Sequence, residues 1–204
     1  TSRILGQSAF YDDVIFDLYT EKHVPSGEIL AHGLPRDPRP VQAYLRYLIG
    51  IGDVPGTTSV WNWVISHAYA DDRMAREYVD FVLSTHRYDI AAQSWAQYLG
   101  PRRNDYLTSN WFFNGDFESE PSGAAFDWKI DNSGTAEAVR DPTVAHSGSH
   151  SLRIQFRGQD NVNYGTISQT AFVTPASYRF QAYIHTEASP TNQRYPYQLS
   201  DPHP

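Results

Sequence analysis

The sequence predicts an α+β protein of two domains, with α-helical hairpins in residues 1–105 and an antiparallel β-sandwich in residues 106–204. Three observations support this prediction. Apolar residues recur with a period of about 3.6 in the first part, which is typical of amphipathic helices. From residue 110 on, apolar and polar residues alternate with a period of about two, as in half-buried strands. Turn signals separate these alternating runs at the spacing of a β-sandwich.

Four amphipathic helices are expected in the first hundred residues. They are expected to begin near Pro40, Thr58 or Ser59, Asp71 or Asp72, and Asp89, since proline suits a first helical turn and short polar side chains cap it. A further helix is expected in residues 4–20, with Phe10, Val14 and Leu18 as its apolar face. Residues 25–40 hold four prolines and are expected to form a loop or broken turn.

The expected helices pair into hairpins that repeat about every 30 to 35 residues, a period in the range of α-solenoid repeats. The layout resembles tetratricopeptide repeats, although few of their small residues are present. An isolated helical bundle is the alternative. In either arrangement the large aromatic side chains of the helices are expected to be core residues rather than part of a cofactor site, namely Trp61, Trp63, Trp95 and Tyr98.

The domain boundary is expected within residues 101–109, where the helical period ends. The strands that follow are expected at residues 111–113, 126–131, 136–139, 152–157, 166–173 and 178–186. A half-buried strand is clearest where Leu152, Ile154 and Phe156 alternate with polar residues.

Several short segments of the second part carry a family resemblance in their order and spacing. They are Asn114–Glu118, Trp128, Ala145–Leu152, Tyr164–Gly165, Ile167–Gln169 and Tyr178–Tyr183. Between residues 110 and 187 the chain resembles the jelly-roll carbohydrate-binding modules attached to bacterial xylanases and glucanases. The resemblance implies a jelly-roll sandwich with a concave sheet face lined by aromatic and amide side chains, and a structural calcium near the first strand. Such modules are longer than this segment, so a truncated sandwich is expected.

A sugar-binding face is expected on this sandwich, because a pyranose stacks its apolar face on aromatic rings and its hydroxyls need directional polar partners. Strand parity places several polar and aromatic side chains on one outward stripe. The candidate carbohydrate-binding residues are Trp128, Tyr164, Gln169, Arg179, Gln181, Tyr183 and His185. A solvated sheet face without a ligand is the alternative.

Two carboxylates at the start of the sandwich are candidate metal ligands. Asp116 and Glu118 could supply oxygens to a structural calcium, which takes 6 to 8 oxygen ligands. A hydrated turn is the alternative. No zinc site is expected at His146 and His150, because they straddle a Ser-Gly-Ser turn and not one face of a helix.

Composition and motifs exclude several classes of function. Sixteen Lys and Arg against 23 Asp and Glu give a formal net charge of −7, so a nucleic-acid partner is not expected. No apolar run reaches the length of a membrane span, and zero cysteines exclude disulfides. No nucleophile elbow, phosphate loop or dinucleotide fingerprint is present, so the chain is not expected to be an enzyme.

The function expected first is that of a non-catalytic carbohydrate-binding protein of the bacterial envelope or exopolysaccharide system, periplasmic or extracellular, with a polysaccharide or oligosaccharide as its partner. The alternative is a protein-interaction scaffold, which a groove with exposed helix aromatics such as Trp63 or Tyr44 would favour. A hydrolase is a third hypothesis, with Asp127 paired with Asp131 or Glu137 across a cleft.

Overall fold

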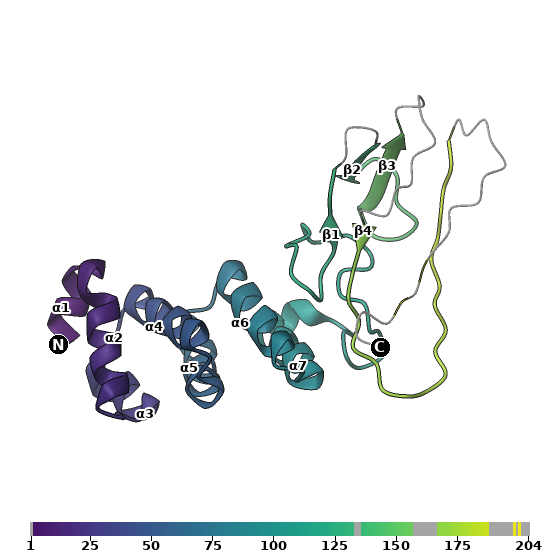
Figure 1. The fold of residues 1–204 in the computed structure, drawn as a ribbon. Coiled ribbons are helices and arrows are strands. Elements are labelled where there is room, and N and C mark those ends of the chain that lie inside the picture. Colours follow the sequence, from purple (N-terminus) through teal and green to yellow (C-terminus); the bar gives the residue numbers. More distant parts are fainter. Residues whose placement is uncertain (1, 133–135, 157–166, 188–197, 199, 201–204) are drawn as a thin grey trace. The chain divides into compact units, whose positions relative to one another are not determined.

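The computed structural model describes most of the 204 residues, namely 2–132, 136–156, 167–187, 198 and 200. The chain divides into two compact units, Thr1–Thr174 and Pro175–Pro204. Every helix and strand of the described residues lies in the first unit (Figure 1). The predicted domain boundary at residue 105 therefore falls inside this unit. No helix among the described residues combines the length and apolar character that a bilayer span requires.

The first hundred residues form seven α-helices with short turns between them. Their bounds are α1 (Ser2–Gln7), the 3-10 turn η1 (Ala9–Tyr11), α2 (Asp12–Glu21), α3 (Ser26–Glu28), the π turn η2 (Ile29–Gly33), α4 (Pro38–Ile51), α5 (Val54–Ser66), α6 (Asp72–Ser84), α7 (Tyr88–Leu99) and the 3-10 turn η3 (Gly100–Arg103). The four predicted helices correspond to α4 to α7 and are confirmed.

Aspartate caps start three of these helices. Asp37, Asp53 and Asp71 accept hydrogen bonds from backbone N–H groups in the first turns of α4, α5 and α6, which satisfies donors that a helix leaves unpaired. The expected start of the second helix at Thr58 or Ser59 is wrong, because Asp53 caps it at Val54. The expected cap at Asp71 is confirmed.

Consecutive helices pack as two hairpins. α4 packs against α5 and α6 against α7, and α4 also contacts α6, so the hairpins lie next to one another (Figure 1). Trp61 on α5 stacks on Tyr78 on α6, with ring centroids 4.3 Å apart and planes 12° apart. Trp61 and Trp95 are buried in the core, as expected, and Trp63 and Tyr98 are partly buried against it.

The loop expected at residues 25–40 is wrong in part. Residues 26–33 form α3 and η2, and Ile29 and Leu30 are buried in the helical core. The Tyr19 hydroxyl donates to the Gly33 carbonyl at 3.0 Å. The prolines do not prevent this helical turn, because they lie before and after it.

The apolar face expected for the first helix is also wrong. α2 buries Ile15 and Phe16, whereas Phe10, Val14 and Leu18 are 83%, 66% and 47% exposed. Phe16 packs on the rings of Tyr44 and Tyr47 at 5.1 and 5.5 Å. Because these contacts bury the Phe16 side of α2 against α4, the expected apolar face with Val14 and Leu18 lies toward solvent.

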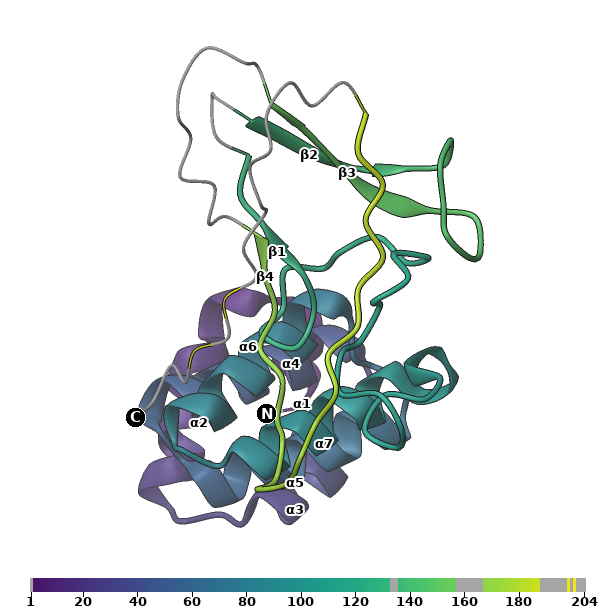
Figure 2. The ribbon, with the colours of Figure 1, turned by 90° about the vertical axis from the view of Figure 1, so that its right-hand side faces the viewer.

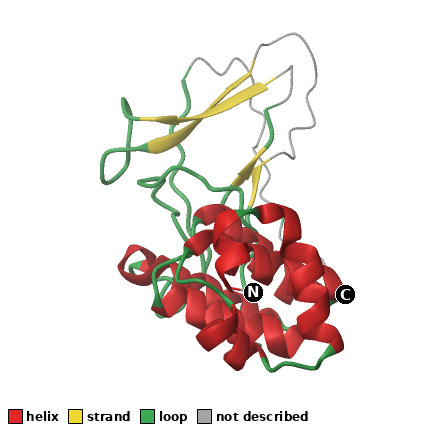
Figure 3. Ribbon diagram, turned by 90° about the vertical axis from the view of Figure 1, so that its left-hand side faces the viewer, coloured by secondary structure: helices red, strands yellow, loops and turns green. Residues whose placement is uncertain are grey.

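The described residues form no β-sandwich, so the predicted α+β fold with a jelly roll is wrong. Their four strands make two separate antiparallel pairs, β1 with β4 and β2 with β3 (Figure 2). The strands are β1 (Lys129–Ile130), β2 (Ala136–Asp141), β3 (Ser151–Phe156) and β4 (Ile167–Ser168). The fold is mainly helical (Figure 3).

Alternation along the chain is not sufficient for a sandwich, because a sandwich needs a second sheet that covers each apolar face. Ile154 and Phe156 on β3 are each 39% exposed. Residues 111–113 form no strand, and neither do residues 178–187, where Phe180 and Ile184 are 45% and 56% exposed. The apolar residues of these runs therefore do not build a sheet core of their own.

The helical core extends into the segment that follows α7. Phe113 makes edge contacts with Trp95 on α7 at 5.9 Å and with Tyr106 at 6.1 Å. Phe126 is also buried in the same core. The segment between η3 and β1 therefore folds on the helices through aromatic burial and with little strand pairing.

Tyr106 provides a test of this packing. Its side chain is buried, burial raises the pKa of its phenol, and its hydroxyl has no hydrogen-bond partner among the residues that the structure describes. A buried hydroxyl without a partner costs roughly 1–3 kcal/mol, so we expect Tyr106→Phe to raise the free energy of unfolding by about 1 kcal/mol in urea denaturation.

Tyr47→Phe is the matched control. The Tyr47 hydroxyl donates to Asp17 at 2.8 Å, so its loss is expected to lower the free energy of unfolding by about 0.5–1 kcal/mol. A loss of stability in Tyr106→Phe as well would contradict an unpartnered hydroxyl.

Candidate functional site

Two hollows on the first unit are candidate sites. The Trp63 hollow has a volume of about 460 Å³ and is lined by Gly27, Leu30, Ala31, Ser59, Asn62, Trp63 and Ser66. The Trp128 hollow has a volume of about 580 Å³ and is lined by Glu120, Pro121, Ser122, Gly123, Trp128, Ile130, Asn132, Ala138, Val139, Arg140, Pro142 and His150. Both volumes are in the range of ligand sites in proteins, roughly 300–1,000 Å³.

The Trp63 hollow lies between α5 and the α3–η2 turn. Four of its residues share one stripe of α5 at positions i, i+3, i+4 and i+7, namely Ser59, Asn62, Trp63 and Ser66. This spacing places side chains on one helix face. The α3–η2 turn supplies Gly27, Leu30 and Ala31 opposite them, and its contact with α5 forms the second wall.

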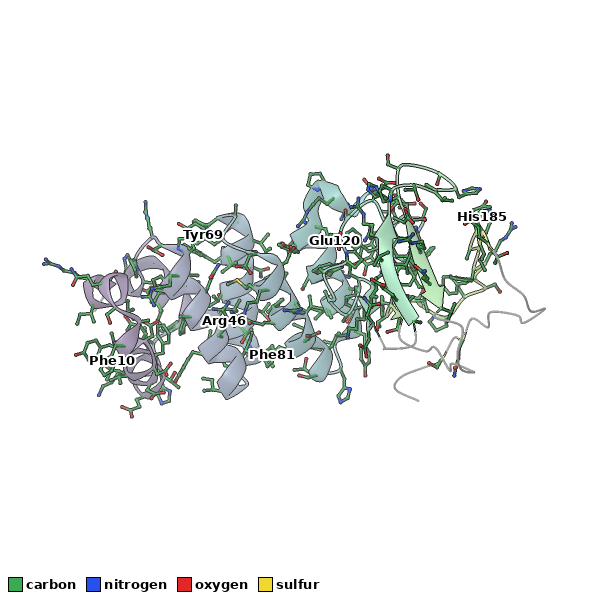
Figure 4. The ribbon with its side chains drawn as sticks, turned by 90° about the horizontal axis from the view of Figure 1, so that it is seen from above. Phe10, Arg46, Tyr69, Phe81, Glu120 and His185 are labelled. Atoms are coloured by element: carbon green, nitrogen blue, oxygen red, sulfur yellow. The ribbon has the colours of Figure 1, made fainter. Side chains whose placement is uncertain are left out.

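Neighbouring rings hold the Trp63 indole in place. It stacks on His67 with centroids 3.7 Å apart and planes 16° apart. Tyr69 (labelled in Figure 4) makes an edge contact with the indole at 5.5 Å. His67 Nδ1 also lies 2.8 Å from the Trp63 carbonyl oxygen. The apolar ring of the hollow is therefore preorganised.

From the sequence, Trp63 and Tyr44 were predicted as aromatic residues that could be exposed in a binding groove. The structure separates them: Trp63 lines the hollow, whereas Tyr44 is 2% exposed and lies in the core with its hydroxyl 3.4 Å from Ser26. The residues of the α3–η2 wall were missed because a loop was expected there. The stripe on α5 could have been found from its helical period.

Trp128 has a structural role in the second hollow. Its indole N–H donates to the Asn114 carbonyl at 2.8 Å, and its ring stacks on Phe117 with centroids 5.0 Å apart. The Asn114 side chain in turn bonds both the N–H and the carbonyl of Ser119 at 2.9 Å. These contacts fix the turn that the sequence identified as Asn-Gly-Asp-Phe-Glu.

The polar side chains of the Trp128 hollow are largely occupied by the protein's own backbone. Arg140 donates to the carbonyls of Phe117 and Glu118 at 2.7 Å. The Asn132 amide bonds the backbone of Ala138 in both directions. Glu120, whose side chain is 80% exposed, lies 3.9 Å from Arg140 and is available to a ligand.

The predicted carbohydrate-binding residues have different environments. Trp128 lines its hollow, whereas the Gln169 amide nitrogen donates to the carbonyls of Phe113 and Phe126 at 2.8 and 2.9 Å, which is a structural role. Tyr164 lies outside the described residues.

The other four predicted residues belong to the second unit. They are Arg179, Gln181, Tyr183 and His185, which lie on an exposed segment without strand pairing (His185 is labelled in Figure 4). Within that unit the Gln181 amide donates to the Tyr183 hydroxyl, and His185 lies 3.7 Å from Glu187. The sheet stripe expected for these residues is therefore not formed, because their segment is not a strand.

The predicted calcium ligands hold the turns of the chain together. Glu118 accepts hydrogen bonds from the backbone N–H groups of Ser149 and His150 at 2.5 and 2.9 Å, and its other oxygen lies 3.2 Å from His150 Nδ1. Asp116 accepts from the Glu118 N–H at 3.3 Å. In the described part of the chain no three His, Asp or Glu side chains cluster in a way that could hold a metal ion. Calcium binding stays a prediction.

Asp127, the candidate for a hydrolytic carboxylate, is 1% exposed. It accepts hydrogen bonds from the N–H and hydroxyl of Ser122 and from the N–H of Trp128, all at 2.7–2.8 Å. This carboxylate therefore stabilises the Ser122 turn.

Comparison of the chain with protein-family models, with curated proteins and with solved structures found no match in any of the three. The resemblance to carbohydrate-binding modules therefore stays a prediction.

The hydrogen bonds of Glu118 indicate that the Ser149–His150 turn is sensitive to acid. Hydrogen bonds from the Ser149 N–H and then from the His150 side chain lower the pKa of Glu118 below its usual value of 4.5. A carboxylate with a lowered folded-state pKa adds stability above its unfolded pKa, and that stability is lost as pH falls through the lowered value. We expect an NMR titration to place the Glu118 pKa below 4.5 and to show the Ser149 and His150 amides shifting with it.

Glu118→Gln is expected to remove this acid dependence, and Glu120→Gln, on an exposed side chain, is the control that keeps it. A Glu118 that titrates at its usual value would show that the contact with the Ser149–His150 turn does not persist in solution.

Proposed function

We propose that this protein is a non-catalytic interaction scaffold, and that the Trp63 hollow binds an extended segment of a partner protein. The position of Trp63 carries the proposal, because a half-buried indole lines a hollow between two helical segments instead of filling the core. Aromatic side chains in this setting are the usual anchors of protein interfaces.

The chemistry of the hollow suits a peptide. Trp63 and Leu30 offer apolar surface to one inserted side chain. Small residues allow a peptide backbone to approach closely, namely Gly27, Ala31, Ser59 and Ser66. Asn62 carries both a donor and an acceptor, so it can pair with the N–H or carbonyl of that backbone.

The helical core supports binding by keeping the hollow rigid. Trp61 and Val64, next to Trp63 on α5, are buried at 1% and 0% exposure. α5 is therefore held by the core while its other face stays open. A site that is ordered before binding loses less conformational entropy when a partner binds.

Carbohydrate binding is the second candidate function, and the Trp128 hollow favours it. An indole edge, an exposed carboxylate on Glu120 and the guanidinium of Arg140 line one polar recess, and such groups suit sugar hydroxyls. It ranks second, because Trp128 and Arg140 already bond the backbone.

A peptide screen tests the scaffold. We expect the full chain to select, from an array of unstructured peptides of about 12 residues, sequences with one large apolar side chain, with a Kd in the micromolar range. Trp63→Ala is expected to lower the affinity for those peptides about tenfold or more in isothermal titration.

Phe81→Ala is the matched control, since Phe81 (labelled in Figure 4) is a partly buried aromatic on α6 that does not line the hollow. Equal losses in Trp63→Ala and Phe81→Ala, with both variants folded by circular dichroism, would reject the Trp63 hollow as the site.

A second titration tests the sugar hypothesis. Soluble xylan, β-glucan and exopolysaccharide oligomers are added to the full chain with and without Ca²⁺. If the hollow binds them, Glu120→Ala should weaken binding about threefold to tenfold through a lost charge-assisted hydrogen bond. If Glu120→Ala binds the sugars with unchanged affinity, they do not bind in the Trp128 hollow.

A further inference from the structure

α2 and the 3-10 turn η1 before it leave a row of apolar side chains exposed. Phe10 on η1 and Val14 and Leu18 on α2 follow one another at a spacing of four residues and are 83%, 66% and 47% exposed. Ile4 on α1 and Tyr11 on η1 are also exposed, at 46% and 48%. Phe10 lies at the α1–α2 end of the helices (Figure 4). Large apolar side chains left in solvent in this number are a signal of an interaction surface.

An acidic row borders the apolar row. Asp13, Asp17 and Glu21 follow the same i, i+4, i+8 spacing on α2, and all three are exposed. Like charges at this spacing repel one another along a helix. Arg3 is the one basic residue between residues 2 and 21, and Lys22 follows Glu21 as the C-cap of α2. Asp12, the fourth acid of the helix, pairs with Arg39 at 2.6 Å.

We propose that this surface binds an amphipathic basic helix of a partner protein, with the partner's apolar stripe on Phe10, Val14 and Leu18 and its Lys or Arg residues beside Asp13, Asp17 and Glu21. The proposal rests on the scaffold function proposed above and adds a second surface with a partner of defined chemistry. Helices that dock on an apolar surface present anchors about one turn apart, and Val14 and Leu18 are likewise one turn apart on α2.

Charge selects this occupant over a second copy of the chain. A second copy that packed the same face would add an acidic row to an acidic row, with Arg3 and Lys22 as the only basic side chains of residues 2–22. Like charges across an interface disfavour the pair. A basic helix instead removes the repulsion along α2, so its binding gains from both the apolar and the charged row.

The experiment uses the full chain and three labelled peptides of about 18 residues, or five helical turns. The first has a leucine stripe flanked by lysines, the second has glutamates in place of the lysines, and the third is the first with its order scrambled. Fluorescence anisotropy is expected to show binding of the lysine peptide at least about tenfold tighter than of the other two, and weaker at higher salt.

Surface variants locate the binding. Val14→Asp is expected to lower the affinity for the lysine peptide about tenfold. The double variant Asp13→Lys with Glu21→Lys is expected to bind the glutamate peptide more tightly than the lysine peptide. Val144→Asp, at another exposed apolar residue, should leave binding unchanged. Val14→Asp should also keep the affinity of the chain for the peptides selected on the Trp63 hollow, so either site can fail alone.

Several results would overturn the proposal. Absence of binding to the lysine peptide, equal binding of the lysine and scrambled peptides, or full binding by folded Val14→Asp would each do so. Sedimentation velocity of the chain alone is the remaining arm. A dimer that Val14→Asp dissociates would assign the apolar row to self-association instead.

Discussion

The rest of the structure depends on the burial of aromatic rings between successive helices. Trp61 on α5 stacks on Tyr78 on α6 at 4.3 Å, and this contact joins the α4–α5 hairpin to the α6–α7 hairpin. Phe16 on α2 packs on Tyr44 on α4 with ring centroids 5.1 Å apart, and this contact joins α2 to α4. A large ring that is fully buried removes roughly 150–250 Å² from water. Isolated helices of this length are marginal in water, so these contacts supply the stability that the helices lack alone.

The chain after α7 uses this core instead of building one. Phe113 packs on Trp95, and the Gln169 amide bonds the carbonyls of Phe113 and Phe126, so residues distant in sequence are tied to the last hairpin. Two strand pairs without a covering sheet bury little apolar surface, and a two-stranded hairpin alone is marginally stable. The strands therefore depend on the helices, and loss of the helical core would release them as well.

The same packing creates the two proposed binding surfaces. α5 turns Trp61 inward and Trp63 outward, because residues two apart in a helix point to different faces. α2 buries Phe16 and leaves Val14 exposed for the same reason. Each surface thus lies on the back of a helix that the core holds in place. For the proposed scaffold function, this arrangement keeps the candidate binding faces rigid.

The sequence alone determined that four helices lie where α4 to α7 are found, because their apolar periods and the Asp71 cap are local signals that tertiary contacts did not override. The start of α5 was the exception, since Asp53 caps it at Val54. The sequence also determined the acidic balance and the burial of Trp61 and Trp95. Tertiary structure decided which face of α2 is buried, that residues 26–33 are helical, and that Trp63 and not Tyr44 lines a hollow. The absence of a sandwich among the described residues was also decided by tertiary structure. Alternation of apolar and polar residues indicates that a strand has two different faces, but it does not indicate whether another sheet covers one of them. Helix α4 covers Phe16, and helix α7 covers Phe113. No pattern in the segments around Phe16 and Phe113 specifies these distant partners.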